Sequence, residues 1–323
     1  MPVSMSPALP TDAHIRAAHE RIGPHVHRTP VLTCATLDRM AGATLVFKAE
    51  PLQKVGAFKA RGAVNAVFSL SDEAAARGVA THSSGNHGQA LAYAAARRGI
   101  PAHIVMPETA ARPKLEAVRG YGGRVTLCPP GTRAREQALA DVLAATGADM
   151  VHPYNDPRVI AGQGTCALEL LEQAGPLDLV IAPVGGGGLI SGTALACAAT
   201  APAPRVLGAE PANADDAARS LKAGCIVEDD APDTIADGLR ASLRDLTFAI
   251  IRAHVPAIFT VTEEQIVTAM RLIWQFMKLI VEPSAAVPLA AVLAHPEDFR
   301  GRRVGVILTG GNVDLDRLPW MPP

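Results

Sequence analysis

The sequence has few aromatic residues, almost no excess of charge of either sign, and no long uninterrupted hydrophobic run. Aromatic residues make up 4% of the 323 residues, and the formal net charge is −1. So balanced a charge argues against a nucleic acid or a membrane surface as partner. The longest apolar candidate, residues 279–293, is interrupted by Glu282 and two prolines. It falls short of the roughly 18 apolar residues that suggest a membrane span, so we expect no such span.

Cysteine is also scarce. The chain has five cysteines, an odd number with no C-x-x-C spacing: Cys34, Cys128, Cys166, Cys197 and Cys225. Scattered cysteines of this kind are typical of reduced, buried thiols. The N-terminal residues lack the basic and apolar blocks of a signal peptide. These features predict a reduced protein in the cytoplasm.

What the sequence does contain is an alternation of strand-like and helix-like segments. They follow one another at 102–106, 113–121, 124–128 and 132–145, and strand-like runs recur at 179–184, 205–209 and 304–308. Alternation of this kind predicts parallel α/β sheets flanked by helices. Because 323 residues are many for one core, we expect two lobes with a ligand between them.

Lys59 is a candidate for covalent chemistry with a carbonyl group. It lies in the segment Gly56 to Ala63, where small neighbours leave room for a flat cofactor and a helical pattern follows. Enzymes activate such a lysine by lowering its pKa through burial or a neighbouring cation. Taken alone, Lys59 would more often be a solvated lysine on an amphipathic helix. Its interpretation therefore depends on the other motifs.

A glycine loop is the second motif. Gly185, Gly186, Gly187 and Gly188 stand between the apolar run 177–184 and the helical pattern 189–195. Successive glycines at a helix start let backbone N–H groups converge on a phosphate. The dinucleotide pattern G-x-G-x-x-G is absent, and Thr193 stands where a nucleotide-binding phosphate loop has lysine. A mononucleotide-sized phosphate fits best, although a tight turn without a ligand would explain two of these glycines.

Two polar segments complete the set. Residues 82–89 open an alanine-rich helical run, where backbone N–H groups can hold a carboxylate, and residues 308–312 follow the run 304–307. In parallel sheets, ligands lie at the carboxyl ends of the strands. Ser83, Gly185 and Thr309 all fall at such ends.

In this order and at these separations, the four segments resemble the fold type II pyridoxal-phosphate enzymes, and more narrowly the branch of serine racemases and hydroxyamino-acid dehydratases. The resemblance extends from about Ile15 to Asp316. It implies a two-lobed α/β fold with parallel sheets, pyridoxal 5'-phosphate in the cleft between the lobes, and a homodimer. Residues 1–78 and 155–323 would form the large cofactor-binding domain, and 79–154 a small mobile domain.

The resemblance also assigns roles in binding the cofactor. Lys59 would be the Schiff-base lysine and the base that removes the α-proton, and the glycine loop 185–188 would hold the phosphate. Phe58 would pack against the pyridine ring and Asn86 would hydrogen-bond its hydroxyl group. Thr309 would face the pyridine nitrogen. Because a neutral hydroxyl cannot keep that nitrogen protonated, elimination of a β-substituent is favoured over transamination.

The implied substrate site consists of His82, Ser83, Ser84, Asn86, His87 and Arg135. In a racemase, Ser84 would lie on the ring face opposite the lysine and permit reprotonation from either side. Alternatively, Ser84 caps the helix that begins near Asn86. His82 and Arg135 would line the far end of the substrate, where a cation suits a second carboxylate. Without the resemblance, Arg135 would be a surface residue on a helix.

Glu210, Ala214 and Asp216 match the divalent cation site of this family. Two carboxylates and a backbone carbonyl are hard oxygen ligands that suit structural Mg²⁺ or Ca²⁺. Without the resemblance, acidic residues at a helix start would more often be partners of the helix dipole.

ATP is left open as an effector. Val55 stands where the racemases have threonine, which removes one hydroxyl from their nucleotide site. The positions that match that site are Lys54, Gln89, Tyr121, Lys278 and Asn312.

The resulting hypothesis is a β-hydroxy-amino-acid dehydratase (ammonia-lyase). It would convert L-serine, L-threonine or 3-hydroxyaspartate to a keto acid and ammonia by α,β-elimination. Tyr154, where the animal racemase has asparagine, favours elimination. Serine racemase with a side dehydratase activity is the alternative. The joint presence of Lys59, Ser84, Asn86 and the glycine loop argues against a non-catalytic binding protein, and the lack of an asparagine-rich substrate loop argues against a β-replacement synthase.

Overall fold

The larger of two sheets forms the centre of the molecule. The structure, a computed structural model, describes residues 9–83, 85–110, 112–229 and 231–321. The larger sheet has six strands in the order β1-β2-β10-β7-β8-β9, and every pairing is parallel except that of β1 with β2. Its strands are β1 (Val31–Leu32), β2 (Thr44–Ala49), β7 (Leu179–Pro183), β8 (Arg205–Pro211), β9 (Ile258–Val261) and β10 (Arg303–Leu308).

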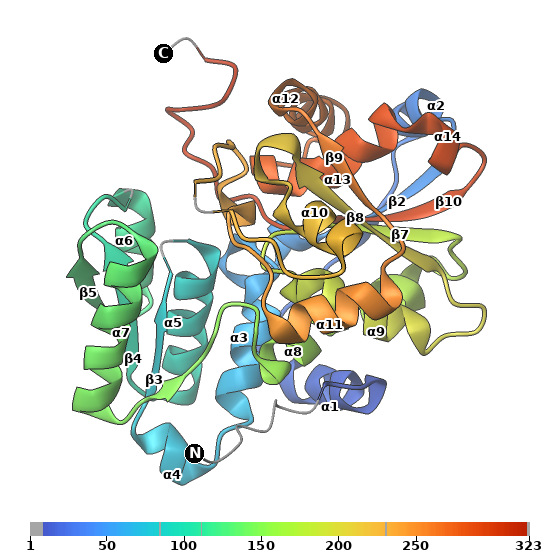
Figure 1. Ribbon diagram of the computed structural model, residues 1–323. Coiled ribbons are helices and arrows are strands. Elements are labelled where there is room, and N and C mark those ends of the chain that lie inside the picture. Colours follow the sequence, from blue (N-terminus) through green and yellow to red (C-terminus); the bar gives the residue numbers. More distant parts are fainter. Residues whose placement is uncertain (1–8, 84, 111, 230, 322–323) are drawn as a thin grey trace.

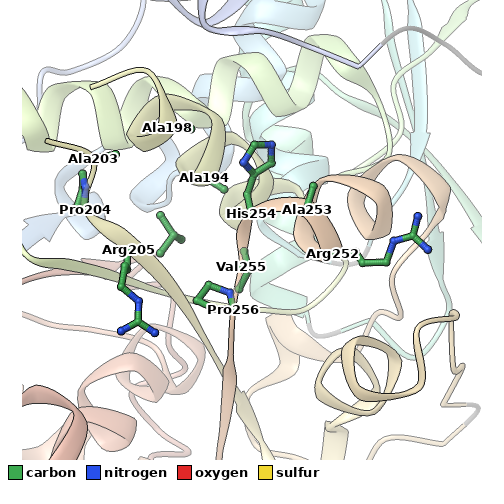
Figure 2. Close-up of a pocket in the computed structure, with 11 residues that line it drawn as sticks. Ala194, Ala198, Ala203, Pro204, Arg205, Arg252, Ala253, His254, Val255 and Pro256 are labelled. Atoms are coloured by element: carbon green, nitrogen blue, oxygen red, sulfur yellow. The ribbon is translucent and has the colours of Figure 1, made fainter. Parts of the chain in front are cut away.

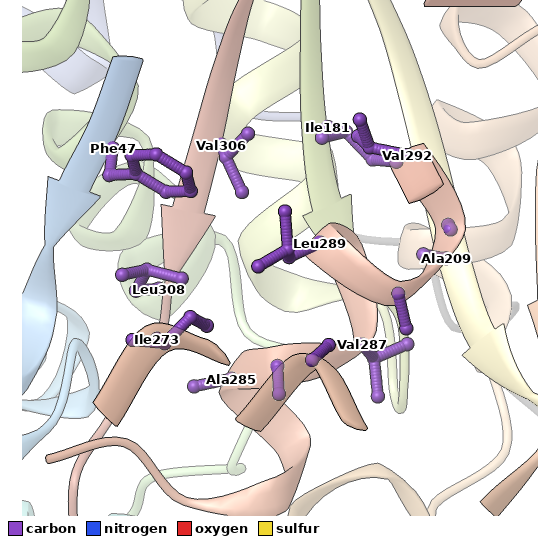
Figure 3. Packing of buried hydrophobic residues seen from close by; sticks show 14 of the residues in the cluster. Phe47, Ile181, Ala209, Ile273, Ala285, Val287, Leu289, Val292, Val306 and Leu308 are labelled. Carbon is purple, nitrogen blue, oxygen red and sulfur yellow. The ribbon is translucent and has the colours of Figure 1, made fainter. Parts of the chain in front are cut away.

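Helices cover both faces of this sheet, as its continuously apolar strands require. One face packs on α2 (Ala35–Ala41), α12 (Glu263–Leu272) and α13 (Pro283–Ala294). Figure 3 shows Leu289 of α13 among Phe47, Ile181 and Val306 of three strands. The other face packs on α8 (Pro157–Ala174), α9 (Gly188–Ala198) and α11 (Asp245–His254).

The smaller sheet has four parallel strands in the order β5-β4-β3-β6. Figure 1 shows it in teal and green, beside the larger sheet. Its strands are β3 (Val79–His82), β4 (Ala102–Pro107), β5 (Arg124–Cys128) and β6 (Asp149–Met150). α5 (Asn86–Arg98) packs between this sheet and α3 (Lys59–Phe68), and α7 (Thr132–Thr146) covers the other face.

The remaining helices are shorter or peripheral. They are α1 (Asp12–Ile22), η1 (Glu50–Leu52), η2 (Lys54–Gly56), α4 (Asp72–Ala76), α6 (Arg112–Gly120), η3 (Ala212–Ala214), α10 (Asp216–Ala223), η4 (Asp237–Leu239), η5 (Ile273–Met277) and α14 (Pro296–Phe299). Two of the longer helices, α3 and α8, approach closely. A Cβ added at Gly162 would lie 2.6 Å from the carbonyl oxygen of Arg61, so this crossing requires glycine.

The predicted parallel α/β architecture is confirmed. The strand-like segments at 102–106, 124–128, 179–184, 205–209 and 304–308 are all strands, whereas the apolar patterns did not predict β1, β2, β6 and β9. β3 to β6 lie within residues 79–150. The domain boundaries at 78 and 155, and the mobility of the small domain, stay predictions.

Two expectations about apolar residues and cysteines can be compared with the structure. None of the described helices is long and apolar enough to cross a membrane, and the run 279–293 overlaps the largely buried helix α13. All five cysteines are unpaired. The prediction that all five are buried was wrong, because Cys225 is exposed and Cys34 is only partly buried.

Candidate functional site

Lys59 is the first residue of α3, and the residue before it is hydrogen-bonded to the segment that follows β10. The backbone N–H of Phe58 donates to the carbonyl of Thr309 at 2.9 Å. The Lys59 Nζ donates to the carbonyl of Pro153 at 2.9 Å. Burial lowers the pKa of Lys59 to about 8, against the opposing charge of Glu282. An amine that titrates so near neutrality can act both as a nucleophile and as a base.

Thr309 has the clearest unmet bonding capacity at this site. It is 2% exposed, and its hydroxyl has no hydrogen-bond partner among the described residues. A buried hydroxyl without a partner costs free energy, which a ligand atom can recover. The Phe58 ring lies nearby, with its centroid 5.1 Å from the Lys59 Nζ.

A chain of side-chain amides and a carboxylate lies close to Lys59. The Asn86 Nδ2 donates to both carboxylate oxygens of Glu282, at 3.0 and 3.1 Å. The Asn312 Nδ2 donates to the Asn86 Oδ1 at 2.8 Å. Burial, with the charge of Asp237, raises the pKa of Glu282 to about 7. These contacts orient Asn86 at the first turn of α5.

The glycine loop joins β7 to α9. Gly187 is the N-cap of α9 with a φ of 85°, which favours glycine. A Cβ added at Gly186 would lie 2.3 Å from the Tyr154 ring. Backbone geometry therefore favours glycine at position 187, and close packing against Tyr154 requires glycine at position 186. The first N–H groups of a helix lack intrahelical partners, so this loop can hold a phosphate.

Three histidines near Lys59 have lowered pKa values: His82, His87 and His152. Burial, then the charge of Lys59, lowers the pKa of His87 well below its usual value. Burial, then His82, lowers the pKa of His152 to about 4. The His152 Nδ1 accepts a hydrogen bond from the Asn155 N–H at 2.9 Å. The centroid of the His152 ring lies 4.6 Å from that of Tyr154 and 6.5 Å from that of His82.

The residues predicted to bind the substrate lie at the start of α5, just before it, and on α7. α5 begins at Asn86, as expected, with Gly85 at the N-cap. Ser83 is partly buried, and its Oγ accepts from the Gly85 N–H at 3.3 Å. Ser84 lies outside the described residues. Arg135 is partly buried on α7, and its charge, after burial of His82 itself, helps to lower the pKa of His82.

Glu210 lies on β8, Ala214 in η3 and Asp216 at the start of α10, and the divalent cation site that they would form stays a prediction. Glu210 is fully buried, and burial, then Asp216, raises its pKa. The Asp216 Oδ2 is buried and without a partner among the described residues. The two Glu210 oxygens accept hydrogen bonds from the backbone N–H groups of Ala217 and Ala218, at 3.2 and 2.8 Å. Two buried carboxylates close to one another suit a hard divalent ion.

Several residues of the site were not predicted. Glu282 was noted only as the acidic residue that interrupts an apolar run, and that interruption was the available signal. Arg244, whose charge acts on His82 and His152, carried no motif at all. Lys114 of α6 and Asp237 of η4 form an ion pair; they lie 123 residues apart.

A surface cavity of about 390 Å³ lies elsewhere, at the amino end of β8 between α9 and α11. Figure 2 shows its lining, which includes Arg205, Arg252 and His254. The glycine loop and Thr309 follow the opposite, carboxyl ends of the strands. This cavity is therefore separate from the Lys59 site.

The chain is similar to known proteins along most of its length. Residues 22–310 match the family described as pyridoxal-phosphate dependent enzyme. The chain is 59% identical to a beta-hydroxyaspartate dehydratase of Paracoccus denitrificans, covering 97% of this chain and 99% of that protein. It is 50% identical to a serine racemase of Arabidopsis thaliana, covering 94% and 93%.

The chain is also similar to solved structures of such enzymes. Maize serine racemase superposes with a TM-score of 0.94 at 47% identity, covering 96% of this chain and 95% of that chain. A T.th. threonine deaminase superposes with a TM-score of 0.91 at 46% identity, covering 95% and 99%.

Proposed function

The chain belongs to the pyridoxal-phosphate-dependent enzymes, and on that premise we propose that it is a β-hydroxy-amino-acid dehydratase whose preferred substrate is 3-hydroxyaspartate. The products would be a keto acid and ammonia, formed by α,β-elimination. The observation that carries the proposal is the 59% identity to a beta-hydroxyaspartate dehydratase over nearly the whole of both chains. L-serine and L-threonine would be poorer substrates.

The described residues fit pyridoxal phosphate. The Lys59 amine, with its pKa lowered to about 8 by burial, suits attachment to an aldehyde. The glycine loop at the start of α9 suits the phosphate. The buried Thr309 hydroxyl, which has no partner among the described residues, suits a ring nitrogen. When bound, pyridoxal phosphate supplies an electron sink for negative charge at the substrate α-carbon.

The protein's own residues then position the substrate and move its protons. The backbone N–H groups at the start of α5 bind the α-carboxylate, helped by the helix dipole. The Lys59 amine takes the α-proton, for which a pKa near the working pH is best. Beside the ring nitrogen, the neutral Thr309 hydroxyl would leave the electron sink weak. This favours elimination, in which the α-proton and the β-hydroxyl leave the substrate in sum as water.

Serine racemase is the second candidate. Identity of 50% to the Arabidopsis thaliana enzyme supports it. Ser84 would then be the acid–base on the second face. Formation of D-serine from L-serine distinguishes the two activities.

The test is turnover of both diastereomers of 3-hydroxyaspartate, L-threonine and L-serine, with keto acid and D-serine measured in parallel. We expect kcat/KM to be highest for one diastereomer of 3-hydroxyaspartate, and Lys59→Ala to be inactive. A higher kcat/KM for L-threonine than for 3-hydroxyaspartate, unaffected by Arg135→Ala, would contradict 3-hydroxyaspartate as the preferred substrate. D-serine in excess of keto acid would favour the racemase.

Further parts of the proposal concern ions, effectors and assembly. The buried carboxylates of Glu210 and Asp216, with the Ala214 carbonyl, support a structural Mg²⁺ or Ca²⁺ site. ATP as an effector, a homodimer and a cytoplasmic location stay predictions.

A further inference from the structure

Arg244 immediately precedes α11. Hydrogen bonds connect this segment, through Asn155, to His152. The Arg244 N–H donates to the Thr247 Oγ1 at 3.2 Å. The next residue, Asp245, accepts a hydrogen bond from the Asn155 Nδ2 at 2.7 Å. Asn155 in turn donates its backbone N–H to His152, on which the charges of Lys59 and His82 act. Arg244 is therefore held beside the histidines that surround Lys59.

The guanidinium of Arg244 lies near the side chains of Tyr154 and Glu228. It acts on Tyr154, where its positive charge opposes the rise in pKa that burial causes; the Tyr154 ring lies against Gly186 of the glycine loop. It also pairs with Glu228 at 2.7 Å, with side-chain exposures of 43% and 55%. An ion pair so exposed contributes little to stability, so a substrate carboxylate can replace Glu228.

Arg244 and Arg135 approach His82 from different lobes. Arg135 belongs to α7, which packs on the smaller sheet, and Arg244 precedes α11, which packs beside the larger one. After burial, the charges of both arginines keep the pKa of His82 low, as does the charge of Arg244 for His152. Because the pKa values of these histidines are lowered, the two arginines are the groups near His82 that stay positively charged among those named in its surroundings.

We propose that Arg244 is a specificity-determining residue that binds the distal carboxylate of a dicarboxylic substrate, from the lobe opposite Arg135. A planar guanidinium can grip a carboxylate through two parallel hydrogen bonds. L-serine and L-threonine have no second carboxylate and gain nothing from it. This assignment deepens the proposed function and rests on it for the reaction.

The experiment compares Arg244→Gln with the unmodified enzyme on 3-hydroxyaspartate and L-serine. We expect kcat/KM for 3-hydroxyaspartate to fall about 10- to 100-fold, mainly through KM, with a change of less than about threefold for L-serine. Arg252→Gln, an exposed arginine on the same helix, is the matched control for charge. Glu228→Gln removes the partner of Arg244 and should leave the preference intact.

A second measurement uses malonate, a dicarboxylate without an amino group, as the ligand. We expect Arg244→Gln to weaken malonate binding, measured by thermal shift, by about tenfold or more, and Arg252→Gln to leave it unchanged. An equal loss of kcat/KM for both substrates would assign Arg244 a structural role and overturn the proposal. An unchanged substrate preference would overturn it too.

Failure of the proposed function is distinguishable from failure of this assignment. If the unmodified enzyme turns over no 3-hydroxyaspartate, the proposed function is wrong and malonate alone tests Arg244. Weaker malonate binding in Arg244→Gln then supports a dicarboxylate site, and unchanged binding overturns it.

Discussion

At Lys59, two opposing effects set the protonation of the amine. Burial lowers its pKa to about 8, and the negative charge of Glu282 raises it. The Glu282 carboxylate is itself buried, 4% exposed, with a pKa raised to about 7. Lys59 is therefore sensitive to the charge on a residue that lies 223 positions away in the sequence (282 minus 59).

We predict that Glu282→Gln lowers the pKa of Lys59 further, because the ammonium form loses a favourable charge. The rate at which the apoenzyme captures pyridoxal phosphate should rise with pH as the amine is deprotonated. Its midpoint should move from about 8 to a lower pH in the variant. Asp298→Asn, an exposed acidic residue on α14, serves as control. A midpoint that stays in place or moves upward would contradict this electrostatic account.

At the scale of elements, α3 is anchored by a buried network of charges. The Arg61 Nε lies 2.8 Å from a Glu50 oxygen, and its Nη1 lies 2.7 Å from Glu169. The Lys48 Nζ lies 2.7 Å from Glu169. All four side chains are buried. Because α3 begins with Lys59, this network also holds the reactive lysine in place.

We predict that Glu169→Gln destabilises the protein by about 3–5 kcal/mol, because it leaves buried cations without full compensation. Urea unfolding monitored by circular dichroism measures the change. Glu116→Gln removes the exposed partner of Arg112 and should change the free energy of unfolding by less than about 1 kcal/mol. Equal changes in the free energy of unfolding for the two substitutions would show that Glu169 in the buried network stabilises the protein no more than an exposed ion pair does.

The same network predicts a dependence of stability on pH. Burial alone would raise the pKa of Glu169, but the hydrogen bonds and charges of Arg61 and Lys48 outweigh it and lower the pKa. The stabilisation is therefore complete above the unfolded value of about 4.3 and is lost as the pH falls toward the folded value. Unfolding free energies measured between pH 3 and 6 should fall less steeply in Glu169→Gln. Parallel curves would contradict the assignment.

The segment from β8 to α10 gives a prediction about metal ions. A cation that binds only the folded state at about 100 times its Kd adds roughly 2.7 kcal/mol of stability. We therefore expect Mg²⁺ or Ca²⁺ to raise the Tm and EDTA to reverse the effect. Asp216→Asn should abolish the response, whereas Glu264→Gln, at an exposed residue of α12, should retain it. The same rise in Asp216→Asn would place the ion elsewhere.

At the scale of the whole molecule, an ion pair joins the helices around the two sheets. Lys114 of α6 pairs with Asp237 of η4, and both side chains are partly exposed, at 30% and 44%. α6 packs in the cluster of the smaller sheet, and Leu239 of η4 in that of the larger. Both charges act on Glu282, so the pair lies near the cofactor-binding residues.

We predict that Lys114→Met makes the holoenzyme lose pyridoxal phosphate between about 1.5- and 5-fold faster, the range expected for a partly exposed pair. The rate of cofactor release into an excess of a trapping apoenzyme measures this. Arg112→Met on the same helix is the control. Because the two partners act as a unit, Lys114→Met combined with Asp237→Asn should add little to either single change. Fully additive effects of the two substitutions would show that the Lys114–Asp237 ion pair does not slow cofactor release.

Much of the architecture was accessible from local pattern. β4, β5, β7, β8 and β10 coincide with predicted segments, since continuous apolar runs beside helical periods are a strong local signal. The two-residue strands β1 and β6 are too short for such a signal. At the site, Glu282, His152 and Arg244 went unassigned because their chemistry comes from neighbours that are distant in the sequence.

The sequence by itself determined the motifs whose residues are contiguous: Lys59 at a helix start, the four glycines before α9, and Thr309 at the end of a strand. Their meaning follows from backbone geometry over a few residues, which short-range physics controls. Only the tertiary structure decided that Asn86 meets Glu282 across 196 positions and that Lys48 meets Glu169 across 121. It also decided which of these groups lose contact with water. Burial and long-range charge set their pKa values, and neither is encoded in a local pattern.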